Sequence, residues 1–172
     1  LPPGPGVFAG VARRRELDAA LVVRARAAGA TVLEGHTLTA VDARPDRVAL
    51  VVRRGDDAGP LRVEARYAIG ADGMLSPLRR LLGLAMPGYR GYWHAFRQYL
   101  TGVGPAASRD LVTLFEPDIL PGYFWSFPVG EGEANVGFGI RRGGPVAVGD
   151  MAEVWASLLE RPHIRELLGP DA

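Results

Sequence analysis

AIGADGMLSPLRRLLG, residues 68–83, joins an uncharged run to an Asp-Gly turn and then to the start of a helix. The run from Tyr67 to Ala71 has the uncharged pattern of a parallel strand that is covered on both faces. Asp72 and Gly73 then break the strand. A buried strand that ends at a helix N-terminus is a place to hold phosphates, because free amide groups and the positive helix end favour an anion.

The helix after this turn carries its own start and stop signals. Ser76 followed by Pro77 is typical of an N-cap with proline at the first helical position, and Gly83 supplies the stop. Gly73 would let the backbone approach an anion, and Arg79, one turn into the helix, could add a bidentate contact. The plain alternative is an ordinary strand, turn and helix with a solvated aspartate, which a lone Asp-Gly pair favours.

Composition narrows the class of protein. The chain has 172 residues, of which 48% are hydrophobic and 23% charged, as in a folded globular protein. A net charge of +1 favours neither nucleic acid nor an acidic membrane surface as a partner. The chain has no cysteine and three scattered histidines, which excludes disulfides and thiolate catalysis and offers no metal site. No run is apolar enough for a transmembrane segment, so we expect a cytoplasmic location.

Periodicity divides the chain into two parts. Apolar residues at three- and four-residue steps predict an amphipathic helix over 14–28 that buries its Leu/Ala face. Short β segments are predicted at 31–34, 37–43, 47–53 and 61–71. Aromatic residues alternate with polar ones from 91 to 140, which indicates an antiparallel sheet, and two helices follow it. The domain boundary is therefore expected near 84–92.

Three motifs stand in the order of one known family. VARRRELDAAL resembles an RxxxD helix, DGMLSPLR matches a DGxxSxxR signature, and LPGYFWSFPVGEGEANVGFGI resembles a YxWxFP block. Together they resemble the geranylgeranyl reductase family of FAD-dependent oxidoreductases, within the flavoprotein monooxygenase-like superfamily. The resemblance covers about 13–169 and lacks the family's amino-terminal GxGxxG and its later GD motif, so we expect a central fragment.

The resemblance implies an α/β fold. Residues 1–83 would form a partial, Rossmann-like FAD-binding domain of the p-hydroxybenzoate hydroxylase type, with a β-meander and without its GxGxxG. Residues 84–172 would form a partial substrate-binding domain, an antiparallel sheet plus helices. The residues that match the family's cofactor positions are Arg14, Asp72, Gly73, Ser76 and Arg79. From the residues alone, Arg14 could equally be a solvated charge beside Glu16 and Asp18, Ser76 a helix cap, and Arg79 a structural clamp on the preceding strand.

The aromatic block supplies the candidate substrate site. A strand places Tyr123, Trp125 and Phe127 on one face. Such a stripe is more often core than pocket, but the resemblance implies that it is the floor of a cavity for a long apolar substrate. Gly137 leaves the neighbouring face bare, and Pro128 predicts an edge or bulged position for the aromatic strand.

The function implied by the resemblance is reduction of C=C bonds in prenyl chains, with FAD as cofactor and NAD(P)H or ferredoxin as electron donor. The partner is then a prenyl or other apolar small molecule, without nucleic acid, and a peripheral membrane contact is compatible with it. Two alternatives stay open: an FAD-dependent monooxygenase or halogenase of an aromatic substrate, and a non-catalytic isolated fragment. The catalytic proton donor is unknown.

Overall fold

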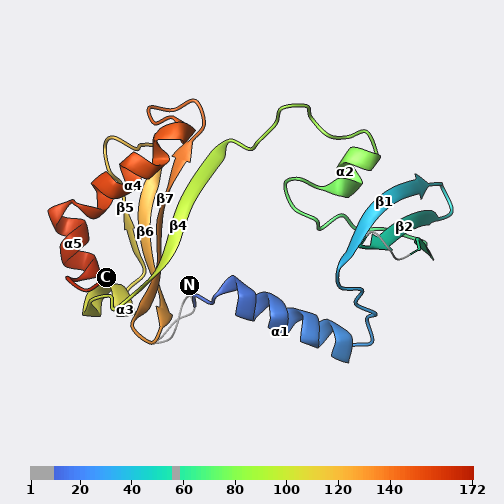
Figure 1. Ribbon diagram of the computed structural model, residues 1–172, viewed down its shortest axis with the longest axis horizontal. Coiled ribbons are helices and arrows are strands. Elements are labelled where there is room, and N and C mark those ends of the chain that lie inside the picture. Colours follow the sequence, from blue (N-terminus) through green and yellow to red (C-terminus); the bar gives the residue numbers. More distant parts are fainter. Residues whose placement is uncertain (1–9, 56–58) are drawn as a thin grey trace, which may run out of the picture. The chain divides into compact units, whose positions relative to one another are not determined.

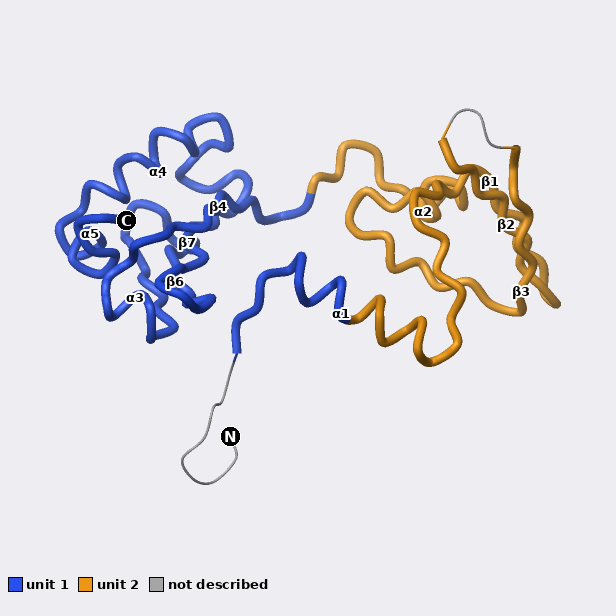
Figure 2. The backbone as a smooth tube through the Cα atoms, turned by 60° about the horizontal axis from the view of Figure 1, so that its bottom comes forward, with its two compact units in different colours: residues 1–20, 91–172 blue, residues 21–90 orange. Residues whose placement is uncertain are grey.

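A computed structural model describes residues 10–55 and 59–172, and these form two compact units. Unit 1 holds the described residues up to Ala20 together with Gly91–Ala172, and unit 2 is Leu21–Arg90 (Figure 2). Helix α1 (Arg14–Ala27) passes from one unit to the other, and Gly29 follows it with a φ of 90°. The helix was predicted, but its burial was not as expected: α1 has no buried residue, and Leu21 is 57% exposed.

Unit 2 is a β-meander followed by a short helix. Its strands β1 (His36–Ala43), β2 (Val48–Arg54) and β3 (Leu61–Ala65) pair antiparallel in the order β1-β2-β3, and α2 (Pro77–Leu81) follows them. The meander confirms three of the predicted β segments in type. Ala49 and Ser76 are the only buried residues among those described in unit 2.

One predicted β segment, 31–34, is absent from unit 2, and the segment predicted over 61–71 ends at Ala65. Residues 31–34 and 67–71 form no strand, and Tyr67 and Ile69 are 82% and 90% exposed, so the prediction of a buried strand before the Asp-Gly turn is wrong for this structure. The reason is that a parallel strand exists only beside neighbours that take its backbone hydrogen bonds. No strand in the described part of the chain pairs with either segment.

Unit 1 is a four-stranded antiparallel sheet with helices on one side (Figure 1). The strands β4 (Trp93–Thr101), β5 (Val112–Leu114), β6 (Tyr123–Gly130) and β7 (Glu133–Arg141) have the order β4-β7-β6-β5. The helical elements are α3 (Pro105–Arg109), η1 (Val148–Asp150), α4 (Met151–Leu159) and α5 (Pro162–Leu168). The expected mixed α/β fold with an antiparallel second part is thus present.

The hydrophobic core lies between this sheet and its helices. Trp155 of α4 stacks on Phe138 with ring centroids 6.1 Å apart and also contacts Phe96 and Phe124. Because side chains alternate along a strand, the core takes the even-numbered residues of β4, β6 and β7. The odd-numbered residues, Tyr123, Trp125 and Phe127 among them, belong to the opposite face of the sheet, which we call the outer face.

Strand β6 confirms the bulged position, one of the two alternatives expected for Pro128, and not the edge position. It lies between β7 and β5 and is not an edge strand. Pro128 is tolerated because β5 pairs only with Phe124, Trp125 and Ser126, and because the β6–β7 register shifts between Pro128 and Gly130.

In the described part of the chain, no helix has the length and apolarity needed to cross a membrane.

Candidate cofactor turn and aromatic face

The Asp-Gly turn, residues 72–79, is held by two capping hydrogen bonds. The Ser76 hydroxyl accepts from the backbone N–H of Arg79 at 3.0 Å, which makes it the N-cap of α2 as the sequence predicts. The Asp72 carboxylate accepts from the N–H of Leu78, also at 3.0 Å. Both amides are therefore already bonded. The expectation that they are free to bind phosphate is wrong for this structure.

Asp72 is an exposed, ionised acceptor. Hydrogen bonds from the Ser76 side chain and from the Leu78 backbone hold the pKa of Asp72 below its usual value. An ionised carboxylate accepts hydrogen bonds and repels phosphate, so its natural partner is a hydroxyl group. Gly73 has a φ of 77°, and a Cβ built on it would meet no atom within 4 Å, so a ligand can approach the backbone there.

Arg79 stabilises the turn with one nitrogen, while its Nε–H donor stays unpaired within the described ranges. One of its terminal nitrogens donates to the backbone carbonyl of Met74 at 2.5 Å, so Arg79 clamps the turn itself and not the segment before it, where the sequence had placed the clamp. Its Nε is buried and has no hydrogen-bond partner among the described residues. Asp72, Gly73, Ser76 and Arg79 line one hollow of about 250 Å³. The structure thus brings together four of the five predicted cofactor residues.

Arg14, the fifth, belongs to unit 1 and does not line that hollow. Its guanidinium makes two hydrogen bonds to Asp18, at 3.0 and 3.1 Å, and these raise the pKa of Arg14. This is the exposed ion pair that the residues alone allowed. Arg14 lines a different hollow of about 440 Å³, where Arg97 and Tyr99 of β4 are also found.

The outer face of the unit 1 sheet carries a continuous row of rings. The ring centroids of Tyr123 and Trp125 are 6.0 Å apart, and those of Trp125 and Phe127 are 6.2 Å apart. Tyr123 and Trp125 line a hollow of about 360 Å³ together with Trp93 of β4 and Gly139 of β7, whereas Phe127 does not line it. The predicted face is therefore confirmed, and its role in binding stays a prediction.

Two residues that the sequence analysis missed shape this hollow. Trp93 completes it from β4, and Asn135 accepts a hydrogen bond from the indole N–H of Trp125 at 3.1 Å. Trp125 is only 9% exposed because its ring lies over Gly137, where a Cβ would come within 2.6 Å of the ring. The odd-numbered positions of β4, beginning at Trp93, were the signal that could have identified the first of them.

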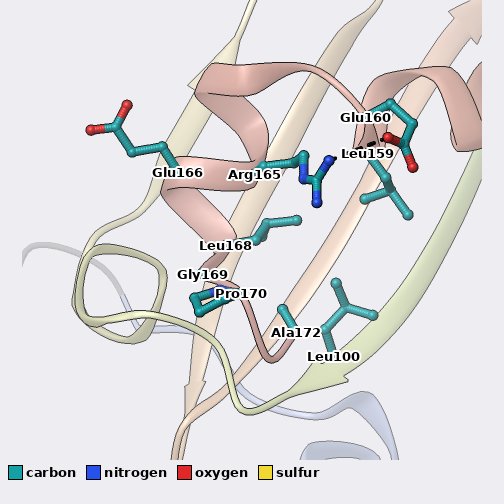
Figure 3. Close-up of a pocket in the computed structure, with 9 residues that line it drawn as sticks. All are labelled: Leu100, Leu159, Glu160, Arg165, Glu166, Leu168, Gly169, Pro170 and Ala172. Carbon is teal, nitrogen blue, oxygen red and sulfur yellow. Dashed lines mark hydrogen bonds and ion pairs between the residues drawn. The ribbon is translucent and has the colours of Figure 1, made fainter.

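Another hollow, of about 490 Å³, lies in unit 1 between β4 and the end of α5 (Figure 3). Leu100, Leu159 and Leu168 contribute apolar surface, and Arg165 forms an ion pair with Glu160 at 3.4 Å. It contains none of the predicted site residues.

Comparison with known proteins identifies the family. The family model described as "FAD binding domain" matches residues 8–109. The chain belongs to this family. The match spans α1, the meander and the Asp-Gly turn, and it supports FAD as the cofactor.

Relatives and solved structures of this FAD-binding family extend the resemblance. A digeranylgeranylglycerophospholipid reductase 2 of Methanopyrus kandleri is 40% identical over 92% of the chain, and a menaquinone reductase of Mycobacterium tuberculosis is 36% identical over 80% of it. The flavin-dependent halogenase CmlS superposes on 94% of the chain with a TM-score of 0.69 and 25% identity. These matches confirm the resemblance to geranylgeranyl reductases. The chain spans 39%, 34% and 30% of the lengths of these three proteins.

Proposed function

We propose that the complete protein is an FAD-dependent oxidoreductase that reduces C=C bonds of prenyl chains. The observation that carries this proposal is the row formed by Tyr123, Trp125 and Phe127 on the face of the unit 1 sheet opposite to the buried core and α4. Residues 84–172 would then be the substrate part and residues 1–83 part of the cofactor domain. Location in the cytoplasm, with a peripheral membrane contact, belongs to the same proposal.

In this proposal the aromatic row holds the apolar substrate. Bound FAD, once reduced by NAD(P)H or ferredoxin, would supply hydride for the double bond, and the second hydrogen would arrive as a proton from a side chain or water. The rings offer a continuous apolar surface that would keep water away from a prenyl chain, and the hydrogen bond from Trp125 to Asn135 fixes the orientation of the indole. Bound in this way, the chain would be positioned without any charged contact along its length.

The substrate role can be tested by product mass. We expect the complete protein, reduced without oxygen and mixed with a geranylgeranyl substrate, to add two hydrogens per double bond. Trp125→Ala should weaken substrate binding about tenfold or more, because a buried aromatic contact is lost. Tyr67→Ala is the control, since this ring is 82% exposed, belongs to unit 2 and does not line the hollow. If Trp125→Ala lowers the melting temperature but leaves substrate affinity unchanged, the aromatic row is part of the core and not a substrate site.

For the cofactor, we propose that Asp72 accepts hydrogen bonds from hydroxyl groups of the ribose or ribityl chain. Its ionised carboxylate, the open approach over Gly73 and the unsatisfied Nε of Arg79 support this assignment. Ser76 would act through the cap that it forms, and Arg14 would contact FAD only after giving up Asp18. The isolated 172-residue chain should not retain FAD, because one turn cannot offset the entropy of ordering a dinucleotide.

The test of this site is FAD content. We expect Asp72→Asn to lower the FAD-to-protein ratio of the complete protein, whereas Asp46→Asn, which changes an exposed aspartate in a turn of the same unit, should leave it unchanged. Equal FAD content in the two variants would remove Asp72 from the cofactor site.

The second candidate is a monooxygenase or halogenase, favoured by the structural similarity to CmlS. The two reactions differ in their use of oxygen. Fast reoxidation of the reduced protein by oxygen on addition of an aromatic substrate, with no hydrogenated prenyl product, would select the second candidate.

A further inference from the structure

The outer face of unit 1 carries a cation immediately beside its aromatic row. Arg97 of β4 pairs with Gly137 of β7, and Gly137 pairs on its other side with Trp125 of β6. A Cβ on Gly137 would lie 2.6 Å from the Trp125 ring and 2.9 Å from Cβ of Arg97. The guanidinium side chain and the indole therefore flank one glycine on one face of the sheet.

Arg97 belongs to the hollow of about 440 Å³ that arginines of α1 also line. Most charges around this hollow are already paired. Arg13 forms an ion pair with Glu133 and another with Glu16 at 3.6 Å, and Arg14 is bonded to Asp18. The two remaining arginines are Arg15 and Arg97, and neither forms an ion pair with a carboxylate within the described ranges. The hollow therefore has an excess of positive charge.

The geometry of Arg97 suits an anionic oxygen. Its Nη1 donates to the Tyr99 hydroxyl at 3.1 Å, and its guanidinium carbon lies 5.5 Å from the centre of the Tyr99 ring. These contacts hold the planar group in place and occupy few of its five N–H donors. Because the Tyr99 hydroxyl accepts from Arg97, its own proton is available to a ligand. Thr101, which also lines the hollow, adds a second hydroxyl.

We propose that Arg97, with Arg15 and Tyr99, binds the anionic head group of the substrate whose apolar chain lies on the aromatic row. This assignment rests on the proposed function and makes Arg97 a specificity-determining residue. A phosphate-bearing isoprenoid would place its charge on the unpaired arginines and its hydrocarbon on Trp125, Tyr123 and Trp93. A neutral prenyl quinone or alcohol would leave the arginine contacts unmade.

The test compares two ligands with the same hydrocarbon chain. We expect the complete, FAD-loaded protein to bind geranylgeranyl phosphate about tenfold or more tightly than geranylgeraniol, because charge-assisted hydrogen bonds form only with the phosphate. Arg97→Gln should reduce phosphate affinity to nearly that of the alcohol and leave alcohol affinity and FAD content unchanged. Arg97→Lys should retain part of the preference, since it keeps the charge and loses the planar fork.

Arg141→Gln is the matched control. Arg141 is an exposed arginine on the outer face, paired with Trp93 at the other end of β7, and it lines neither hollow on that face. We expect its replacement to leave the preference for phosphate unchanged.

Each contrary outcome overturns the assignment in a different way. Equal binding of phosphate and alcohol by the unaltered protein removes the head-group site and leaves the prenyl site standing. Loss of FAD in Arg97→Gln assigns the arginines to the cofactor diphosphate instead. Loss of the preference in Arg141→Gln moves the anion to the other end of the face. Failure of the unaltered protein to bind either ligand removes the proposed function together with this inference.

Discussion

The two units differ in what their apolar residues contact. In unit 1 a contiguous buried cluster joins the sheet to α3, α4 and α5, with Phe124, Phe138 and Trp155 at its centre. In unit 2, Ala49 is the one buried apolar residue among those described, and Ile69 is 90% exposed. Unit 1 therefore has a core made by its own residues, whereas the strand-like sequence of unit 2 before the Asp-Gly turn has nothing to pair with in the described structure.

The largest effect is expected from the core of unit 1. Trp155→Ala should lower the free energy of unfolding of unit 1 by about 3–5 kcal/mol, the range for deleting a large buried ring. Hydrogen exchange should show that amide protection is lost in β6 and β7 and is unchanged in β1 and β2. Trp93→Ala, at a tryptophan that is 53% exposed, is the control. Equal loss of protection in both units would show that they unfold together and would break the comparison.

An intermediate effect is expected at a network of charged side chains within unit 1. Glu116 accepts hydrogen bonds from Arg161 and from His163, the latter at 2.8 Å, and Arg161 also contacts Asp118 at 2.6 Å. Burial raises the pKa of Glu116, but these hydrogen bonds outweigh it and hold the pKa below its usual value; Arg161 does the same for Asp118.

Carboxylates with lowered pKa values stabilise unit 1 at neutral pH, and this stability is lost as the pH falls below their ordinary pKa values, about 4, towards the lower folded-state values. Glu116→Gln should cost about 2 kcal/mol at neutral pH, and its urea midpoint should fall less steeply on acidification than that of the unaltered chain. Asp110→Asn, in an exposed pair with Arg109, should change the midpoint little. An unchanged acid dependence in Glu116→Gln would exclude this carboxylate as the source.

The smallest effect is expected at the most exposed apolar residue of unit 2. Ile69→Ser should change the stability of the chain by no more than about 0.5 kcal/mol, because almost no apolar contact is lost. Thermal unfolding of the two chains checks this directly. A clear drop in melting temperature would mean that Ile69 is buried in solution. Unit 2 would then bury apolar residues as unit 1 does.

Local signals explain what the sequence could predict. Ser76 and Pro77 start α2 where expected, because a cap and a fixed φ act within one turn. The shared face of Tyr123 and Trp125 follows from the two-residue period of a strand and needs no partner. Such features depend only on residues that are close in the sequence.

Non-local pairing explains the rest. The segment before Asp72 reads as a buried strand, but its pattern does not say which neighbours supply the hydrogen bonds. The interior place of β6 and the position of Arg97 beside Trp125 depend on a register between β4, β7 and β6 that periodicity alone does not fix. The amide groups of α2 were misjudged for another reason, since Asp72 and Ser76 occupy them from the turn itself.

Gly137 also sets a length scale for whatever crosses it. Because Gly137 has no side chain, the Trp125 ring lies over it and comes close to Arg97, although the strands that carry these two residues are two strand spacings, about 10 Å, apart. This fixed spacing limits the length of the linker between the polar head group and the apolar tail of a ligand. It does not limit the length of the tail. Isoprenoids of different tail lengths but the same short linker should fit this face alike, and a longer linker should not.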